Sequence, residues 1–382
     1  MIFFKKSGNH KIIELFGFIR LKFKIKEKET TFAKKLQTEL YKCLNNNFKQ
    51  EEYYTNPYYG NKYNAVSCNV PKDAVKNKQF KSKLWNDFKH FYNTEDIEKV
   101  YELLNNSDSK KIYIKVLLYR FLGPERVKLP LSDINCWQGC EQFEKSLFTK
   151  KIDNVFSEYS LQNAGFNCTC LTSPIWVMEN LFLHQYLYKK NDVSIMPSKG
   201  DYIIDGGACY AVNSLCFADI VGDNGKVFCF EAFPDNLKVI ASNIEKNPNL
   251  KNRIIVKNSA LGNTVKKCNF LLAGGASYCQ KESSENTIEI DCVSIDNLVN
   301  SGEIKKIDFI KLDIEGAEYD TLLGAENAIK KFKPKMAISL YHNNMDYTRI
   351  PIYLNSIVPE YKFYFEHYTP VGWESILYAT TK

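Results

Sequence analysis

The chain has 382 residues, of which 45% are hydrophobic and 25% charged, an ordinary composition for a globular protein with room for more than one domain. Its net charge of +7 is concentrated in residues 1–28, where eight Lys/Arg face two Glu and give +6, which leaves about +1 for the rest. A nearly neutral body argues against a nucleic-acid-binding protein. No apolar run approaches the ~20 residues of a membrane span, and Glu14 and Arg20 interrupt the N-terminal apolar stretch, so we predict no export signal and a cytoplasmic location.

Residues 1–28 form a basic arm in which apolar and cationic residues alternate from Leu21 to Lys26, a pattern typical of a half-buried strand. An edge strand with a solvated lysine face is the simpler interpretation of this arm. The alternative is peripheral contact with an anionic membrane surface.

Residues 29–198 are predicted to be a mainly helical N-terminal region, and residues 199–382 a separate nucleotide-type domain. Apolar residues recur at helical spacing in three segments of this region, Val100–Leu104, Ile112–Phe121 and Trp176–Tyr188.

Five short apolar runs within residues 199–382 each end on a polar residue that can take part in binding or catalysis. The residues at these ends are Asp205, Glu231, Asn258, Asp313 and His342. Runs this short, rich in β-branched and aromatic residues and separated by helical patterns, indicate strands of a buried parallel sheet. Ligands of such sheets bind outside the carboxyl ends of the strands, so this edge is the predicted active site.

The segments between these runs complete the predicted fold. Helices are predicted from Pro234 to about Glu245 and from about Ala317 to Lys331. Antiparallel strands are predicted at Cys268–Leu272 and Thr287–Val293 with a turn at Gly274-Gly275, and a final hairpin at Lys362–Glu366 and Glu374–Ala379. The predicted fold class is α/β, with a doubly wound, mainly parallel sheet and an antiparallel C-terminal hairpin.

The segment after the first strand predicts a nucleotide loop. Asp205, Gly206, Gly207 and Ala208 open a helix, and the glycines allow the backbone to approach a ligand. A dinucleotide fingerprint requires three glycines in G-x-G-x-x-G. Here an acidic residue ends the strand, which suits a ligand with a cationic amine and repels a pyrophosphate, so S-adenosylmethionine is favoured.

Further cofactor contacts are predicted at the next two strand ends. Glu231 can accept hydrogen bonds from both ribose hydroxyls, and Asn236 can reach the ligand from the first turn of the following helix. Asn258 and Ser259 are expected to pass the adenine. Asn243 is expected at the surface.

These segments, and above all the KxDxEGxE pattern within Phe309–Glu318, resemble the FkbM-type S-adenosylmethionine-dependent methyltransferases over about residues 200–380. The resemblance implies a class I methyltransferase fold and O-methyl transfer to a sugar or another hydroxylated metabolite. The basic arm resembles the leaders of bacterial enzymes that build surface polysaccharide, so a glycan precursor is the expected partner. Ala211 replaces the second glycine of the nucleotide loop, and Glu366 stands where related sequences often have Arg.

Methyl transfer to a hydroxyl requires removal of its proton. His342 has the unperturbed pKa and the strand-end position of a general base, with a structural imidazole as the alternative. Asp313 and Glu315 can bind the acceptor, orient His342 or hold Mg²⁺; the hydrogen-bonding role is favoured, and no metal ligand is assigned. Lys311 and Glu318 are expected to form an ion pair.

Two other functions stay open at this point. One is an NAD(P)-dependent oxidoreductase on a similar sheet, and the other is a non-catalytic interaction module on a methyltransferase fold. The sequence does not indicate an oligomeric state.

Overall fold

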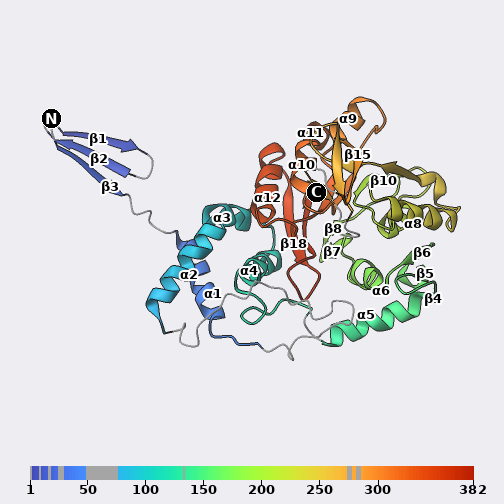
Figure 1. The fold of residues 1–382 in the computed structure, drawn as a ribbon, viewed down its shortest axis with the longest axis horizontal. Helices are drawn as coiled ribbons and strands as arrows, with labels where there is room; N and C mark the ends of the chain where they lie inside the picture. The colour runs from blue at the N-terminus through green and yellow to red at the C-terminus, as the bar shows by residue number, and fades with distance from the viewer. Residues whose placement is uncertain are drawn as a thin grey trace.

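The computed structural model describes residues 2–7, 10–15, 19–24, 30–48, 76–131, 134–272, 278–280 and 285–382. A seven-stranded sheet with helices packed against it lies at the centre of the fold (Figure 1). Its strands, in chain order, are β9 (Tyr202–Gly206), β10 (Lys226–Glu231), β11 (Ile254–Asn258), β16 (Phe309–Leu312), β17 (Lys335–Ser339), β18 (Lys362–His367) and β19 (Ser375–Thr380).

The strand order is β11-β10-β9-β16-β17-β19-β18, and β19 alone runs antiparallel to its neighbours. This arrangement is that of the class I methyltransferase fold, so the predicted parallel sheet and its C-terminal antiparallel hairpin are confirmed. The chain runs outward from β9 through β10 to β11 and then returns to β16 on the other side of β9, which leaves a crevice at the carboxyl ends of β9 and β16.

Alternate residues of the strands face two separate cores, as expected for a sheet covered on both sides. On one side, Ile203 and Val227 pack with α7 (Val212–Val221) and α8 (Pro234–Glu245). On the other side, Ile204 and Phe228 pack in the core that receives α9 (Ile295–Asn300), α10 (Glu318–Leu323), α11 (Glu326–Phe332) and α12 (Asp346–Ile357).

The single helix predicted from Ala317 to Lys331 is wrong, because the chain breaks it into α10 and α11 at Gly324. A Cβ at Gly324 would lie 2.3 Å from the carbonyl oxygen of Gly262, so only glycine allows this close approach. Asp296 then accepts hydrogen bonds from the backbone N–H groups of Asn327 and Ala328 and starts α11.

A smaller sheet covers one end of the domain. Its strands are β12 (Ala260–Leu261), β13 (Lys266–Leu271), β14 (Tyr278–Gln280) and β15 (Thr287–Val293), in the order β12-β15-β13-β14. The short 3₁₀-helix η4 (Lys251–Arg253) precedes β11 of the large sheet. The antiparallel pairing of β13 with β15 agrees with the sequence prediction. The turn predicted at Gly274-Gly275 lies outside the described residues.

The first part of the chain forms three antiparallel strands, β1 (Ile2–Ser7), β2 (His10–Leu15) and β3 (Ile19–Lys24). The alternation of residues from Leu21 to Lys26 had predicted one strand. Among the described residues from 30 to 147, the chain forms the helices α1 (Thr31–Cys43), α2 (Lys78–Phe91), α3 (Thr94–Leu103), α4 (Ser107–Leu122) and α5 (Ile134–Leu147). Figure 1 shows α3 and α4 beside α12 and β18, where Ser109 Oγ accepts a hydrogen bond from the backbone N–H of Phe365. In the described part of the chain, no helix combines the length and the apolar character that crossing a membrane would require.

The stretch before the large sheet is less helical than predicted. It consists of β4 (Phe148–Lys151), β5 (Ser157–Ser160), η2 (Gln162–Ala164), β6 (Thr169–Thr172), α6 (Pro174–Trp176), the π-helix η3 (Val177–Phe182), β7 (Tyr188–Lys190) and β8 (Val193–Ile195). The helix expected up to Tyr188 ends at Phe182, because His184 adopts a left-handed conformation with φ of 53° and turns the chain.

Asn243 is a further correction, because this residue is fully buried and not at the surface. Its side-chain oxygen accepts from the backbone N–H of Leu171 at 2.6 Å, and its amide donates to the carbonyls of Leu171 and Tyr210. Asn243 thus ties α8 to β6 and to the loop that follows β9.

Candidate active site

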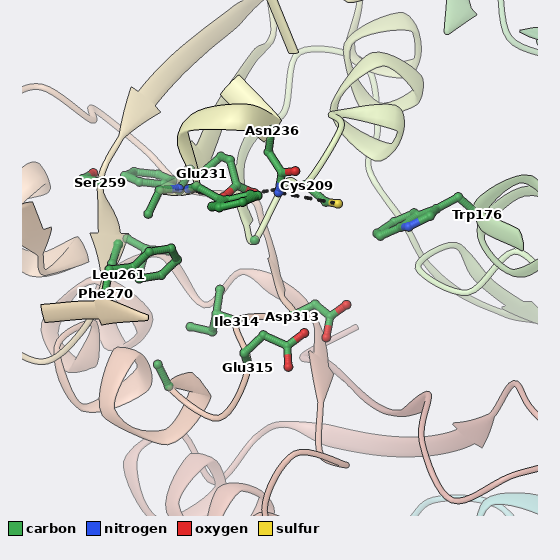
Figure 2. Close-up of a pocket in the computed structure, with 16 residues that line it drawn as sticks. Trp176, Cys209, Glu231, Asn236, Ser259, Leu261, Phe270, Asp313, Ile314 and Glu315 are labelled. Atoms are coloured by element: carbon green, nitrogen blue, oxygen red, sulfur yellow. Dashed lines mark hydrogen bonds between the residues drawn. The ribbon is translucent and has the colours of Figure 1, made fainter. Parts of the chain in front are cut away.

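A cleft with about 740 Å³ of empty space opens at the carboxyl ends of the central strands (Figure 2). Its lining comes from the loops after β9, β10, β11 and β16, from β13 and from one residue of the N-terminal region: Trp176, Gly207, Cys209, Phe230, Glu231, Ala232, Phe233, Asn236, Ser259, Ala260, Leu261, Phe270, Asp313, Ile314, Glu315 and Ala317.

The loop after β9 is shaped by three left-handed residues, Gly207, Cys209 and Ala211, with φ of 72°, 52° and 60°. A Cβ at Gly207 would lie 1.8 Å from the carbonyl oxygen of Asp313, so the loop packs directly on the strand end where glycine alone fits. Ala211, at the position of the missing glycine, starts α7 and is completely buried. Ala208 is buried behind the lining, where its N–H donates to the carbonyl of Phe230.

Asp205 does not line the cleft but supports its floor. It is fully buried, with Lys311 Nζ 3.2 Å from one carboxylate oxygen and the Ser214 hydroxyl donating to the other at 2.6 Å. Lys311 Nζ also donates to the carbonyls of Gly206 and Gly207, at 3.0 and 2.7 Å. Asp205 and Lys311 therefore hold the backbone of the loop, and any effect of Asp205 on a ligand passes through that loop.

The pairing predicted between Lys311 and Glu318 is wrong. The register of β9 with β16 sets Lys311 directly opposite Asp205, and Glu318 lies beyond the strand in α10. Burial by itself would lower the pKa of Lys311, but the charges of Asp205 and Asp313 outweigh it and raise the pKa above its ordinary value.

Glu231 is fixed at the end of β10 by backbone donors. One carboxylate oxygen accepts from Cys209 N–H at 2.8 Å, and the other from the N–H groups of Ala232 and Phe233 at 2.8 and 2.7 Å. Burial raises the pKa of Glu231, against the effect of these hydrogen bonds and of one with Asn236. Asn236, in the first turn of α8, stands beside it in the cleft (Figure 2).

At the third strand the structure separates the two predicted residues. Ser259 is buried and lines the cleft, whereas Asn258 is exposed at the end of β11 and does not line it. Ten of the sixteen lining residues were not predicted as site residues, among them Trp176, Cys209 and Phe270. Trp176 and Phe270 were missed because their positions fit the spacing of apolar core residues. Cys209 was missed because it only follows the loop glycines, and nothing else in the sequence around it indicated a role in binding.

Asp313, after β16, is held by two tyrosines. Its carboxylate accepts from the hydroxyls of Tyr186 and Tyr341, at 2.9 and 3.0 Å. Burial would raise the pKa of Asp313, but the charges of His342 and Lys311 outweigh it and lower the pKa below its ordinary value. Asp313 is therefore an ionised carboxylate at the edge of the cleft.

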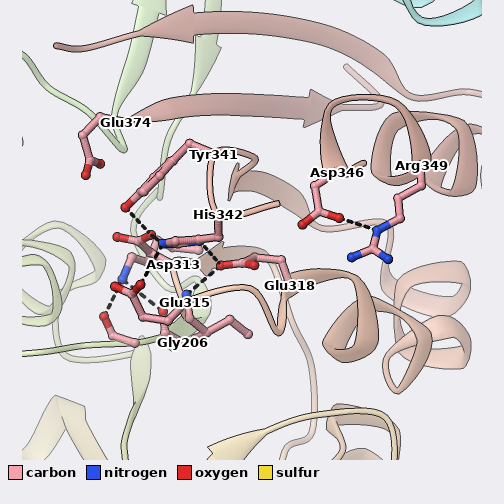
Figure 3. A network of polar contacts seen from close by, with 12 residues as sticks. Gly206, Asp313, Glu315, Glu318, Tyr341, His342, Asp346, Arg349 and Glu374 are labelled. Carbon is pink, nitrogen blue, oxygen red and sulfur yellow. Dashed lines mark hydrogen bonds and ion pairs between the residues drawn. The ribbon is translucent and has the colours of Figure 1, made fainter. Parts of the chain in front are cut away.

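His342, after β17, is surrounded by carboxylates (Figure 3). Its Nδ1 lies 2.8 Å from Glu318, and its Nε2 lies 3.3 Å from Glu315 and 3.7 Å from Asp313. Burial would lower the pKa of His342, but Glu318, Glu315 and Asp313 raise it to about 12. His342 does not line the cleft, and its role as general base stays a prediction.

Glu315 lines the cleft from a strained turn. It has φ of 55° and is followed by Gly316 with φ of 98°, and this pair redirects the chain from β16 into α10. A left-handed conformation costs a non-glycine residue about 1–2 kcal/mol, and such strain is often found at functional sites. Glu318, by contrast, is fully buried and accepts a hydrogen bond from the backbone N–H of Ile314 at 2.8 Å.

Two further buried ionisable groups lie on the C-terminal hairpin. Glu374 has φ of 62° and accepts a hydrogen bond from the amide of Gln185, and burial together with Asp313 raises its pKa to about 8. His367 contacts the Ser375 hydroxyl through Nδ1 at 2.8 Å, and burial lowers its pKa to about 3. Gln185 and Tyr186 reach this area from the N-terminal region, after the turn at His184.

Comparison with known proteins points to one family. Residues 205–365 match the model of the methyltransferase FkbM domain. The hexuronic acid methyltransferase AglP of Haloferax volcanii is 31% identical over 117 residues, which cover 30% of this chain and 46% of that protein. The chain thus matches less than half the length of this curated relative.

Solved structures with similarity to the chain include a methyltransferase FkbM from Methylobacillus flagellatus, with 20% identity and a TM-score of 0.49 over 75% of this chain and 58% of the other. Another is an O-methyltransferase from Bacillus cereus in complex with SAH, with 14% identity and a TM-score of 0.32 over 66% and 93% of the two chains. The family match includes the loop after β9, Glu231 and the KxDxEGxE segment. Residues 205–365 of this chain thus match the methyltransferase FkbM domain, and the rest of the chain lies outside that match.

Proposed function

We propose that this protein transfers the methyl group of S-adenosylmethionine to a hydroxyl group of a sugar or glycan precursor. The observation that supports this most is the position of Glu231, a carboxylate oriented by three backbone donors next to a glycine loop, in a cleft that ends at Asp313 and Glu315. The similarity to a hexuronic acid methyltransferase favours a carbohydrate acceptor.

The cleft offers a separate environment to each part of the cofactor. Glu231 would accept hydrogen bonds from the ribose hydroxyls, and the backbone at Gly207 would lie against the methionine moiety. Leu261, Phe270 and Ile314 form an apolar wall suited to the adenine (Figure 2). The negative charge of Asp313 favours the positive sulfonium at the other end.

In this proposal the acceptor oxygen attacks the methyl carbon in line with the sulfur. The C–O bond forms as the C–S bond breaks, and its electron pair stays on sulfur, which becomes a neutral thioether. The hydroxyl proton passes to Glu315, which lines the cleft and is not held by the tyrosines that hold Asp313. Alignment of the two reactants supplies much of the acceleration.

The charges of the cleft favour a neutral hydroxyl region in the acceptor. Among the described lining residues three are carboxylates and none is Lys or Arg. Glu366, which stands where related sequences often have Arg, pairs with Lys190 at 2.6 Å and does not line this cleft. A carboxylated sugar would therefore bind with its charge directed away from Asp313 and Glu315.

A dinucleotide oxidoreductase is the main alternative. Glu231 would suit its ribose equally well, but the carboxylates of Asp313 and Glu315 would repel a pyrophosphate, and Ala211 replaces a loop glycine. A non-catalytic module is disfavoured by the buried charge network at the cleft, which costs desolvation energy that a purely structural core avoids.

A methyl-transfer assay on the full-length protein tests the proposal. Labelled S-adenosylmethionine is incubated with neutral sugars, uronic acids and nucleotide-linked sugars, and mass spectrometry identifies acceptors that gain one methyl group. Glu315→Gln should lower turnover by roughly 10²–10⁴-fold while binding of S-adenosylhomocysteine persists. Asp320→Asn, which changes an exposed carboxylate nearby, is the matched control.

Failure of every acceptor to gain a methyl group, despite cofactor binding, would refute the proposed activity. Full turnover in Glu315→Gln would instead remove Glu315 as proton acceptor. A place in bacterial surface polysaccharide synthesis, a cytoplasmic location and contact of residues 1–28 with anionic membranes remain proposals, the last supported by the net charge of +6.

A further inference from the structure

We propose that Asp313, Glu318 and His342 form a binding site for one divalent cation at the edge of the cleft. In the described part of the chain, these three residues make up the group whose side chains can together present ligand atoms to an ion. One ligand atom from each residue can be chosen so that all three lie within 4.8 Å of one another.

The spacing is close to that of a metal coordination sphere. Nitrogen and oxygen ligands lie about 2.0–2.2 Å from a divalent transition metal, so two ligand atoms are at most about 4.4 Å apart. Closing the group from 4.8 Å therefore requires only small side-chain movements.

Two buried polar atoms in the group lack hydrogen-bond partners. His342 Nε2 has none, although the side chain is only 9% exposed, and Glu318 Oε2 has none, although Glu318 is fully buried. Glu315 lies 3.3 Å from Nε2 without forming a hydrogen bond to it. Leaving such atoms unpaired is costly, and a coordinated cation would satisfy them.

The charge balance points the same way. Three carboxylates, Asp313, Glu315 and Glu318, lie within 3.7 Å of one imidazole ring. A single positive charge on that ring cannot neutralise them, whereas a divalent cation compensates two of the three.

The surrounding contacts already orient the ligands. Glu318 Oε1 lies 2.8 Å from His342 Nδ1 and accepts from the Ile314 N–H, and these contacts fix the carboxylate and the ring against each other (Figure 3). The hydroxyls of Tyr186 and Tyr341 hold Asp313 in the same manner. Such outer contacts are typical of metal sites.

The donor set indicates the class of ion. One imidazole nitrogen with carboxylate oxygens suits Mn²⁺ or Zn²⁺ better than Mg²⁺, which prefers oxygen ligands and retains water. Because Asp313 lines the cleft, the ion would stand where it can bind an acceptor oxygen. That consequence rests on the proposed function, but binding of the ion does not.

The test measures Mn²⁺ binding to the full-length protein after EDTA treatment and dialysis, without cofactor or acceptor. Electron paramagnetic resonance of free Mn²⁺ and calorimetry should show one ion per chain, and Mn²⁺ should raise the melting temperature. His342→Asn and Asp313→Asn should each weaken Mn²⁺ binding at least about tenfold, with folding checked by circular dichroism.

Glu158→Gln is the matched control, because Glu158 is a buried carboxylate in β5 that pairs with Lys246, outside the group. This variant should bind Mn²⁺ as the wild type does. The proposal is overturned if the wild type binds neither Mn²⁺ nor Zn²⁺, or if both ligand variants bind with unchanged affinity. Absence of ion binding together with methyl transfer would overturn the metal site and leave the proposed function intact.

Discussion

Replacing Gly207 with alanine tests the contact between the nucleotide loop and β16. The new Cβ would lie 1.8 Å from the Asp313 carbonyl oxygen and 2.8 Å from its carbon, both backbone atoms. Real Cβ contacts stay above 3.0 Å, so the loop or the strand end must move by at least 1.2 Å, the difference between 3.0 and 1.8.

The energetic cost has two parts. The φ of 72° costs an alanine about 1–2 kcal/mol, and overpacking against a rigid backbone adds about 1–3 kcal/mol. Gly222→Ala is the control for a positive φ without crowding, because Gly222 has φ of 67° and open space where the Cβ would point. Its backbone conformation costs an alanine about 1–3 kcal/mol. We therefore expect Gly207→Ala to lose about 2–5 kcal/mol and Gly222→Ala about 1–3 kcal/mol.

Urea unfolding of the two variants and the wild type measures these differences, and calorimetry with S-adenosylhomocysteine measures the cofactor site. Gly207→Ala should bind the ligand more weakly, because Gly207 lines the cleft and its carbonyl accepts from Lys311. Gly222→Ala should bind normally. Equal stability and equal affinity in the two variants would refute the close approach on which the loop geometry depends.

The remaining predictions concern buried charge. Lys311→Met leaves Asp205 buried and unpaired and should lower the free energy of unfolding by about 3–5 kcal/mol. The control Lys330→Met breaks an exposed pair and should lower the free energy of unfolding by no more than about 1 kcal/mol. Similar losses in the two variants would contradict the buried pair of Lys311 with Asp205. The pKa of Glu374, about 8 against an ordinary 4.5, means that the unfolded chain releases this proton first, so stability should fall as pH rises from about 4.5 to 8. The pKa of His367, about 3 against 6.5, means that the unfolded chain takes up a proton first, so stability should fall as pH drops from about 6.5 towards 3. Each effect is at most about 5 kcal/mol, from 3.5 pKa units at 1.36 kcal/mol each. Urea unfolding across this pH range measures both effects, and an unchanged alkaline slope in Glu374→Gln would contradict the assignment.

The sequence was sufficient to predict the sheet and much of the cleft. Short β-branched runs mark buried strands, and parallel strands bring their ends to one edge, so Glu231, Ser259, Asp313 and Glu315 meet as expected. The two adjacent glycines after the first strand, Gly206 and Gly207, were enough to predict the loop that lines the cleft.

What could not be predicted depends on contacts between distant segments. The pairing of Lys311 with Asp205 needs the strand register, which local patterns do not contain. Tyr186 and Trp176 reach the site from the N-terminal region, and helical periodicity gave no sign of the turn at His184. The high pKa of His342 likewise requires the carboxylates that follow β16 to surround a ring that follows β17.

Calorimetric titration with S-adenosylhomocysteine, NAD⁺ and NADP⁺ tests most directly whether this cleft is a methyltransferase cofactor site. We predict that the wild type binds S-adenosylhomocysteine and neither dinucleotide. Glu231→Gln should lose about 1.5–3 kcal/mol of binding free energy, as for a hydrogen bond to a charged group. Asp235→Asn, an exposed change in the helix α8 that follows Glu231, should lose none. Binding of a dinucleotide in place of S-adenosylhomocysteine, or undiminished affinity in Glu231→Gln, would contradict the assignment of this cleft.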